Sequence, residues 1–316
     1  MSSRANAETW GYPRRREFEK HLQLAATEWF ERHGRATSRR HPYLLAEWEQ
    51  WPENIILPEV AEYVQSEAAK RHANRQGFPL HRYLHHGLSS QAMLFNLVGP
   101  LIIRKDLVPL REALSQQGIV CPEGPLTATL EHEDREVFRE DTGQPTSLDL
   151  VLEGESGAGT LFVEAKLVEA EFGGCSVFAD GDCDGRNPAP DLRLCYLHHL
   201  GRKYWSLLQE HGFLSGSIGS DATCTLASHY QFFREVLFAL HKGGAFVLLY
   251  DARNPTFYRE GAHGPRGLMP FLLTLVPESQ RAGIASVSIQ QVVDAIKSSG
   301  RHEWTEEFER KYALNS

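Results

Sequence analysis

The sequence predicts an α/β fold with a mixed β-sheet, and three observations support this prediction. Apolar residues recur at helical spacing through much of the first hundred residues. From residue 126 the period changes, and three short strands follow, separated by turn-rich segments. Further helical stretches and a short apolar run at 245–250 come next. The order of helices, three strands in a meander, helices and a strand is typical of an α/β arrangement.

The N-terminal half supplies helices and then the meander. Helical spacing connects three sets of apolar residues, which are Phe18, Leu22, Ala25 and Trp29, then Val60, Val64 and Ala68, then Leu107, Leu110 and Leu114. The segments 126–131, 147–152 and 160–167 are predicted strands, because DTGQPT and EGESGAG supply turn residues between them.

The C-terminal half begins with a predicted loop rich in Gly, Asp and Pro at 173–190. Helices are predicted at 191–210, 228–241, 286–298 and 303–312, and strands at 245–250 and near 271–276. No linker clearly divides the chain. We expect a helical N-terminal region at 1–85, a core at 86–276 and C-terminal helices at 277–316.

Composition excludes several protein classes. The chain has 316 residues, of which 41% are hydrophobic and 23% charged, which is ordinary globular usage rather than disorder. Its longest apolar run, at 93–103, is shorter than the roughly 18 residues of a membrane span. The first thirty residues are charged throughout and lack a secretory signal, so we expect a cytoplasmic protein without a membrane partner. Five cysteines, an odd number, favour reduced thiols or metal ligands over a disulfide framework.

Charge is distributed unevenly along the chain. The formal net charge is −8, yet residues 1–40 hold nine Lys or Arg against five Glu. Residues 131–191 hold sixteen acids against four bases. Net negative charge argues against a nonspecific nucleic-acid binder, because phosphate binding depends on Lys and Arg. A concentrated acidic zone is instead what a cation site requires.

The informative segment is TSLDLVLEGESGAGTLFVEAKL at 146–167. Side chains alternate between the faces of a strand, so Glu164 and Lys166 point to the same side. A hairpin centred between Ser156 and Gly157 pairs positions whose numbers add up to 313. Asp149 then lies opposite Glu164, with Cβ atoms about 4.5–5.5 Å apart. A slip by one residue would place the two carboxylates on opposite faces.

Two carboxylates on one face repel each other unless a cation lies between them. Mg²⁺ prefers carboxylate oxygens and is completed by water and substrate phosphate. Lys166 would lie near the scissile phosphate, where it could orient the nucleophile and offset negative charge. The alternative is a solvated strand face. Of eight lysines, Lys166 and Lys311 alone have an acid two residues earlier, and Lys311 lies in the charged C-terminal tail, so we favour the cation site at Lys166.

Asp149, followed after fourteen residues by Glu164-Ala165-Lys166, resembles the PD-(D/E)xK nuclease superfamily. The resemblance implies an α/β restriction-endonuclease-like αβββαβ core with a mixed sheet. It also implies Mg²⁺ ligation by Asp149, Glu164 and the backbone carbonyl of Ala165, with Lys166 as the catalytic cation. Mn²⁺ is an expected substitute. The departure from the motif is that Leu148, not proline, precedes the first acid.

Further stretches resemble a bacterial restriction-endonuclease-like branch of that superfamily. They are SSQAMLFNLVGPL at 89–101, GQPTSLDLVLEG at 143–154, FVEAKLVEAEFGGC at 162–175 and YQFFREVLFAL at 230–240. In many members a polar residue on the helix after the catalytic strands reaches the site, which makes Gln231 a catalytic candidate. A solvated helical turn carrying Gln231 and Arg234 explains the pattern equally well. Glu131 and Glu133 could add a third acid, although a solvated strand end is the better interpretation for both.

Four cysteines follow the catalytic strand, at separations of eight, twelve and twenty-nine residues. They are Cys175, Cys183, Cys195 and Cys224. Because no close Cys-x-x-Cys pair occurs among them, the spacing indicates neither zinc nor an iron–sulfur cluster. Buried free thiols are the expected state.

These observations predict a Mg²⁺-dependent endonuclease that hydrolyses phosphodiester bonds, with DNA as the substrate and partner. The basic N-terminal segment could steer the nucleic-acid backbone. One alternative is an inactive nucleic-acid-binding or assembly protein with the same fold. A second alternative is a metal-dependent hydrolase of small phosphate esters. The chain does not indicate sequence specificity, strandedness or protein partners, and a homodimer is one option for its assembly.

Overall fold

A five-stranded mixed sheet forms the centre of the fold in the computed structural model, which describes residues 14–155, 159–261, 264–300 and 303–314. The strands lie side by side in chain order, and they are β1 (Leu126–Asp134), β2 (Thr146–Gly154), β3 (Thr160–Lys166), β4 (Ala245–Tyr250) and β5 (Ile284–Ser288). β1, β2 and β3 pair antiparallel, whereas β4 is parallel to both β3 and β5. The predicted meander and the strand at 245–250 are therefore confirmed. The centre of the β2–β3 turn, at 156–157, lies outside the described residues.

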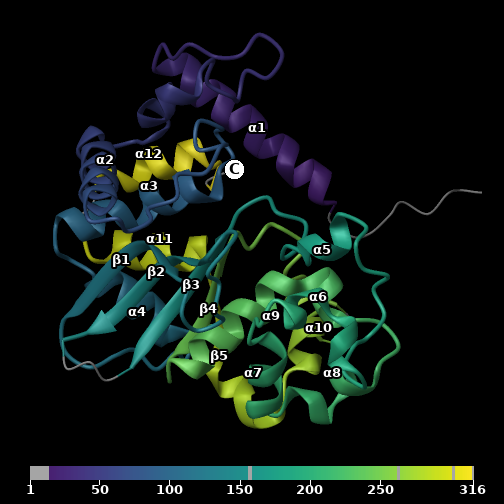
Figure 1. Ribbon diagram of the computed structural model, residues 1–316. Coiled ribbons are helices and arrows are strands. Elements are labelled where there is room, and N and C mark those ends of the chain that lie inside the picture. Colours follow the sequence, from purple (N-terminus) through teal and green to yellow (C-terminus); the bar gives the residue numbers. More distant parts are fainter. Residues whose placement is uncertain (1–13, 156–158, 262–263, 301–302, 315–316) are drawn as a thin grey trace, which may run out of the picture.

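Helices cover both faces of this sheet (Figure 1). One face packs against α1 (Arg15–Arg32), α2 (Pro58–Ala73), α3 (Ser90–Ile103), α4 (Val108–Gln116), α11 (Ile289–Ser298) and α12 (Thr305–Lys311). The other face packs against α7 (Tyr204–Glu210), α9 (Thr225–His241) and α10 (Leu268–Leu275). None of the helices in the described parts of the chain is long and apolar enough to span a membrane.

Shorter elements complete the chain. The helices α5 (Ser176–Ala179), α6 (Tyr196–His199) and α8 (Ser217–Ser220) lie in the long connection between β3 and α9, with the 3₁₀ turns η2 (Leu192–Leu194) and η3 (Phe213–Ser215). The other 3₁₀ turns are η1 (Trp48–Asn54) and η4 (Glu278–Gly283). The connection between β3 and α9 thus contains only short helical pieces.

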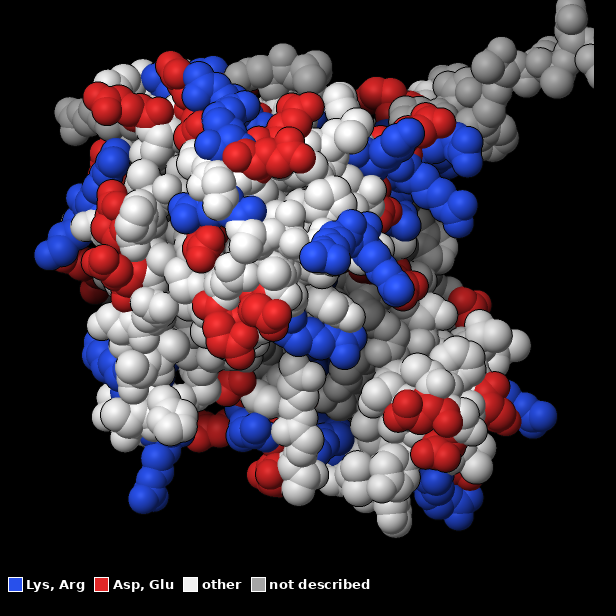
Figure 2. Space-filling model, turned by 90° about the horizontal axis from the view of Figure 1, so that it is seen from above, with Lys and Arg blue, Asp and Glu red and all other residues white. Residues whose placement is uncertain are grey.

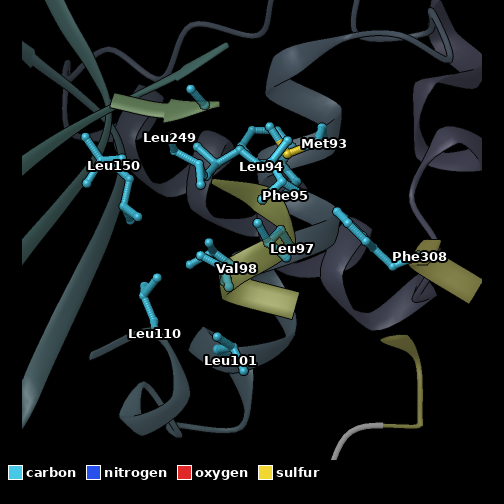
Figure 3. Packing of buried hydrophobic residues seen from close by; sticks show 14 of the residues in the cluster. Met93, Leu94, Phe95, Leu97, Val98, Leu101, Leu110, Leu150, Leu249 and Phe308 are labelled. Carbon is cyan, nitrogen blue, oxygen red and sulfur yellow. The ribbon is translucent and has the colours of Figure 1, made fainter. Parts of the chain in front are cut away.

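The helix α3 is predominantly apolar and is buried along nearly its whole length. Ser89 caps its first turn by accepting a hydrogen bond from the backbone N–H of Ala92 at 3.2 Å. In Figure 3 the side chains of α3 lie between Leu150 and Leu249 of the sheet on one side and Phe308 of α12 on the other. A helix that is hydrophobic on every face belongs in a core rather than on a surface. Residues of all three expected regions therefore share one core, and the boundaries at 85 and 276 stay predictions.

Two elements of the C-terminal half differ from their predictions. The strand predicted near 271–276 is wrong, because those residues lie mostly in α10 and the fifth strand is β5. A short apolar run does not distinguish a buried strand from a helix, which explains the error. The single helix predicted at 191–210 is also wrong, since Gly201, with a φ of +79°, separates α6 from α7. The helices predicted at 286–298 and 303–312 are confirmed as α11 and α12.

Candidate active site

The hairpin of β2 and β3 places two carboxylates side by side. Leu150 pairs with Val163, and every recorded pair of these strands adds up to 313, which confirms the predicted register. Asp149 therefore lies opposite Glu164. Its Oδ2 atom accepts a hydrogen bond from the backbone N–H of Ala165 at 2.8 Å. Both carboxylates line the same cavity of about 490 Å³, so they share one face of the sheet, as the alternation of side chains predicts.

Lys166 and Gln231 complete a hydrogen-bonded group with Glu164. The side chains of Glu164 and Lys166 are nearly buried, and Lys166 Nζ lies 2.6 Å from Glu164 Oε1. Gln231 Oε1 accepts a hydrogen bond from Lys166 Nζ at 3.1 Å, while Gln231 Nε2 donates to Glu164 Oε1 at 2.7 Å. The backbone N–H of Gly173 donates to the same Gln231 oxygen at 3.2 Å. The structure therefore brings Gln231 to the predicted site, because α9 crosses this face between the parallel strands β3 and β4.

Glu131 is a third acid in the same cavity, contrary to the solvated strand end that the sequence favoured. Its side chain is 2% exposed and lines the cavity with Asp149. Leu130 and His132 pair with β2 on either side of Glu131, which itself has a φ of +51° and makes no recorded pair. A left-handed conformation at a residue other than glycine is uncommon and is often found at functional sites. Glu133, in contrast, is partly exposed and lines a different cavity.

Glu235 is a further acid, which the sequence analysis missed. It lies one helical turn after Gln231 on α9 and is fully buried. Neither of its carboxylate oxygens has a hydrogen-bond partner in the described part of the chain. The sequence did contain a signal for Glu235, because an acid lies four residues after Gln231 in an otherwise largely apolar helix.

Burial makes ionisation of these acids unfavourable. Burial raises the pKa of Glu131, Asp149 and Glu235, and repulsion between neighbouring carboxylates raises each of them further. Burial opposes the charge of Lys166, but Glu164 and the other acids nearby outweigh it and raise the pKa of Lys166. The ammonium group of Lys166 thus lies among several carboxyl groups, including those of Glu164, Glu235 and Asp149. This excess of oxygen ligands with unpaired lone pairs fits a hard divalent cation.

A family model described as a restriction endonuclease associating with ARP matches residues 23–313. The chain belongs to this family. The match includes all five strands, α9 and each of the acids of the cavity. The description of this family suggests a nuclease, and it agrees with the restriction-endonuclease-like resemblance found in the sequence. No curated protein and no solved structure shows a significant match to the chain.

A second cavity adjoins the first in this member of the restriction-endonuclease family. It has a volume of about 430 Å³, and Gln144, Gln231 and Arg234 line both cavities. Gly173 and Gly174 form part of its wall, without side chains to narrow it. The two cavities therefore lie next to each other, on either side of Gln231 and Arg234.

Proposed function

We propose that the chain is a metal-dependent nuclease that hydrolyses phosphodiester bonds of DNA. The observation that carries this proposal is the convergence of Glu131, Asp149, Glu164 and Lys166 on one cavity in a member of a restriction-endonuclease family. Carboxylates around a single ammonium group suit metal-assisted phosphoryl chemistry, in which a cation and a positive side chain both face the phosphate.

Asp149 and Glu164 are the residues that would hold Mg²⁺, or Mn²⁺ in its place, together with the backbone carbonyl of Ala165. Glu131 is a further carboxylate within the same cavity. When bound, the cation would polarise the scissile phosphate and lower the pKa of the attacking water. The unpaired Glu131 Oε1 is consistent with a cation ligand that has no protein donor of its own.

Lys166 and Gln231 would position and stabilise the reacting groups. Lys166 keeps its positive charge among the acids, so it would offset the charge that develops on the phosphate rather than accept a proton. Gln231 holds Lys166 through its oxygen and Glu164 through its nitrogen, which restricts both side chains to one arrangement. Such preorganisation lowers the reorganisation required at the moment of reaction.

Basic residues beside the site support a nucleic-acid substrate. Arg15, in the first turn of α1, donates a hydrogen bond to the backbone carbonyl of Val168 at 2.9 Å, two residues after Lys166. Arg14 and Arg16 on either side of it are exposed. Over the face seen from above in Figure 2, basic side chains alternate with acidic ones. The phosphate backbone would therefore meet basic groups next to the site rather than one uniform basic field.

Cleavage of plasmid DNA with Mg²⁺, with Mn²⁺ and with a chelator tests this proposal. We expect cleavage with either metal, none with the chelator, and none by Asp149→Asn. The matched control is Glu153→Gln, because Glu153 is an exposed acid on the same strand and its loss should leave cleavage unchanged. DNA binding by Asp149→Asn, measured separately, should equal or exceed that of the unmodified protein.

The same assay discriminates between the alternatives. DNA binding without cleavage under any metal condition would contradict the proposal and favour an inactive binding protein. Turnover of a small phosphate ester without DNA cleavage would contradict the choice of substrate but leave the metal site in place.

A further inference from the structure

Four of the five cysteines line one small cavity, although they are far apart in the sequence. Cys175 follows β3, Cys183 and Cys195 belong to the long connection, and Cys224 immediately precedes α9. All four are partly buried, and no described cysteine forms a disulfide. Cys121 lies elsewhere, with its sulfur 3.8 Å from the carbonyl of Arg111. The tertiary structure thus gathers a thiol set that the spacing did not indicate.

The sulfur atoms of Cys183 and Cys195 each face an N–H donor. The backbone N–H of Gly185 points to Cys183 Sγ at 3.4 Å. The indole Nε1 of Trp205 points to Cys195 Sγ at 3.3 Å. Both sulfurs therefore accept hydrogen bonds, as the sulfurs of metal-bound cysteines commonly do.

Cys175 and Cys224 also have backbone N–H groups nearby. Burial raises the pKa of both thiols, and the backbone N–H groups of the residues two and three positions further along the chain act in the opposite direction. Hydrogen bonds to the sulfurs are among the features that tune metal clusters held by cysteine. N–H groups thus lie beside all four sulfurs of the cavity, two of them in observed hydrogen bonds.

The separation of the sulfurs distinguishes between two kinds of metal site. Zn–S bonds of about 2.3 Å would place four tetrahedral sulfurs about 3.8 Å apart. Among these four cysteines, which all belong to the described residues, no three sulfur atoms lie within 4.8 Å of one another. Their spacing is too wide for one zinc ion. An iron–sulfur cluster instead puts several iron and sulfide atoms between four cysteines.

We propose that Cys175, Cys183, Cys195 and Cys224 bind an iron–sulfur cluster, at a site separate from the nuclease site and independent of the proposed function. The cluster would attach the connection between β3 and α9 to Cys224, the residue immediately before α9, the helix that carries Gln231. The backbone already joins these segments, since the N–H of Cys175 donates to the carbonyl of Ala227 at 3.1 Å. Because metal binding contributes to folding free energy, the cluster would stabilise a region that has only short helices.

Analysis of the full chain purified without oxygen tests this proposal. We expect iron and acid-labile sulfide in similar amounts, with the visible charge-transfer absorption of a cluster. Cys183→Ser and Cys195→Ser should lose most of the iron and sulfide. Cys121→Ser is the matched control and should keep both. Circular dichroism of each variant shows whether it has folded.

Fluorescence gives a second measurement that does not depend on nuclease activity. The indole of Trp205 contacts Cys195 Sγ, so a bound cluster should quench its emission. Removal of iron by a chelator should increase emission in the unmodified protein, and the increase should be much smaller in Trp205→Phe.

Two results would overturn the proposal. One is the absence of iron and sulfide from the unmodified protein, even after incubation with ferrous iron and sulfide under reducing conditions. The other is stoichiometric zinc without sulfide. Either result would leave the test of the nuclease site unaffected, because that test depends on Mg²⁺ and Asp149.

Discussion

Two Glu-x-Lys triplets occur in this chain, and they have different structural roles. In β3, Glu164 and Lys166 point to the same face, and their charged atoms lie 2.6 Å apart. In α12, Glu309 instead contacts Lys297 at 2.7 Å, and Lys311 donates to Asn54 Oδ1 at 2.8 Å. Residues two apart share a face of a strand but not of a helix. The same two residue types therefore form an ion pair with each other in the strand but not in the helix.

The surroundings of the two lysines also differ. Both side chains are buried, although Lys311 belongs to the charged C-terminal tail. Lys166 is among acids, which raise its pKa despite burial. Lys311 lies 3.6 Å from the centre of the Trp29 ring, and burial followed by repulsion from Arg35 lowers its pKa well below the ordinary value. Acids around a buried lysine thus identify the candidate site, whereas the triplet alone does not.

The largest expected effect separates the two glutamates. Glu164→Gln removes a proposed cation ligand. Under the conditions in which the unmodified protein cleaves plasmid DNA, this variant should show no cleavage. Glu309→Gln removes only an ion pair whose lysine is largely exposed, so cleavage should persist at the normal rate. If both variants lost cleavage equally, the loss would come from lower stability of the folded chain and not from removal of a cation ligand.

The two lysines give the next largest difference. Lys166→Met should lower the single-turnover cleavage rate by about 10²–10³, which is typical for one positioned electrostatic group. Lys311→Met should leave that rate unchanged, because Lys311 contacts Asn54, Trp29 and Phe30, none of which lines the cavity. Lys166→Arg keeps the charge, so partial recovery of the rate would support charge stabilisation over proton transfer. A normal rate for Lys166→Met would remove Lys166 from the mechanism.

Gln231 should have a smaller effect on the rate. Gln231→Leu removes the hydrogen bonds that hold Glu164 and Lys166, and a loss of about 1 kcal/mol corresponds to roughly a fivefold lower rate. Single-turnover cleavage measures this effect, and Gln209→Leu on the exposed face of α7 is the control. If the rate of Gln231→Leu were unchanged, Gln231 would have no role in the cleavage step.

The smallest expected effect is a pH dependence of stability caused by Lys311. Its pKa is lowered in the folded chain, while the unfolded chain keeps an ordinary value of about 10.4. Between those two values the unfolded state binds more protons, so the free energy of unfolding should increase as the pH rises towards 10.4. Denaturant unfolding at several pH values should show a weaker increase for Lys311→Met. The same slope in both proteins would contradict the lowered pKa.

Local sequence determined the part of the fold that depends on neighbouring residues. Alternating apolar residues in β2 and β3, with a turn between them, predicted the register that places Asp149 opposite Glu164, because short-range pairing follows from turn length and side-chain period. The same reasoning failed at α10. A short apolar run fits either a strand or a helix. In the folded chain this run is a helix, and its residues Met269 and Leu272 pack in the same core as α9.

The sequence by itself thus determined the central acid pair and the lysine of the candidate site, since these lie within one hairpin. Only the tertiary structure decided which distant residues join them. Glu131 lines the cavity and is itself in a left-handed conformation in β1. Gln231 reaches the cavity because α9 packs across the sheet, and Glu235 is buried one turn further along the same helix. The four clustered cysteines were beyond prediction for the same reason. When a long connection folds back on itself, residues far apart in the sequence can lie close together in space. The positions of the four cysteines therefore depend on how the helices pack.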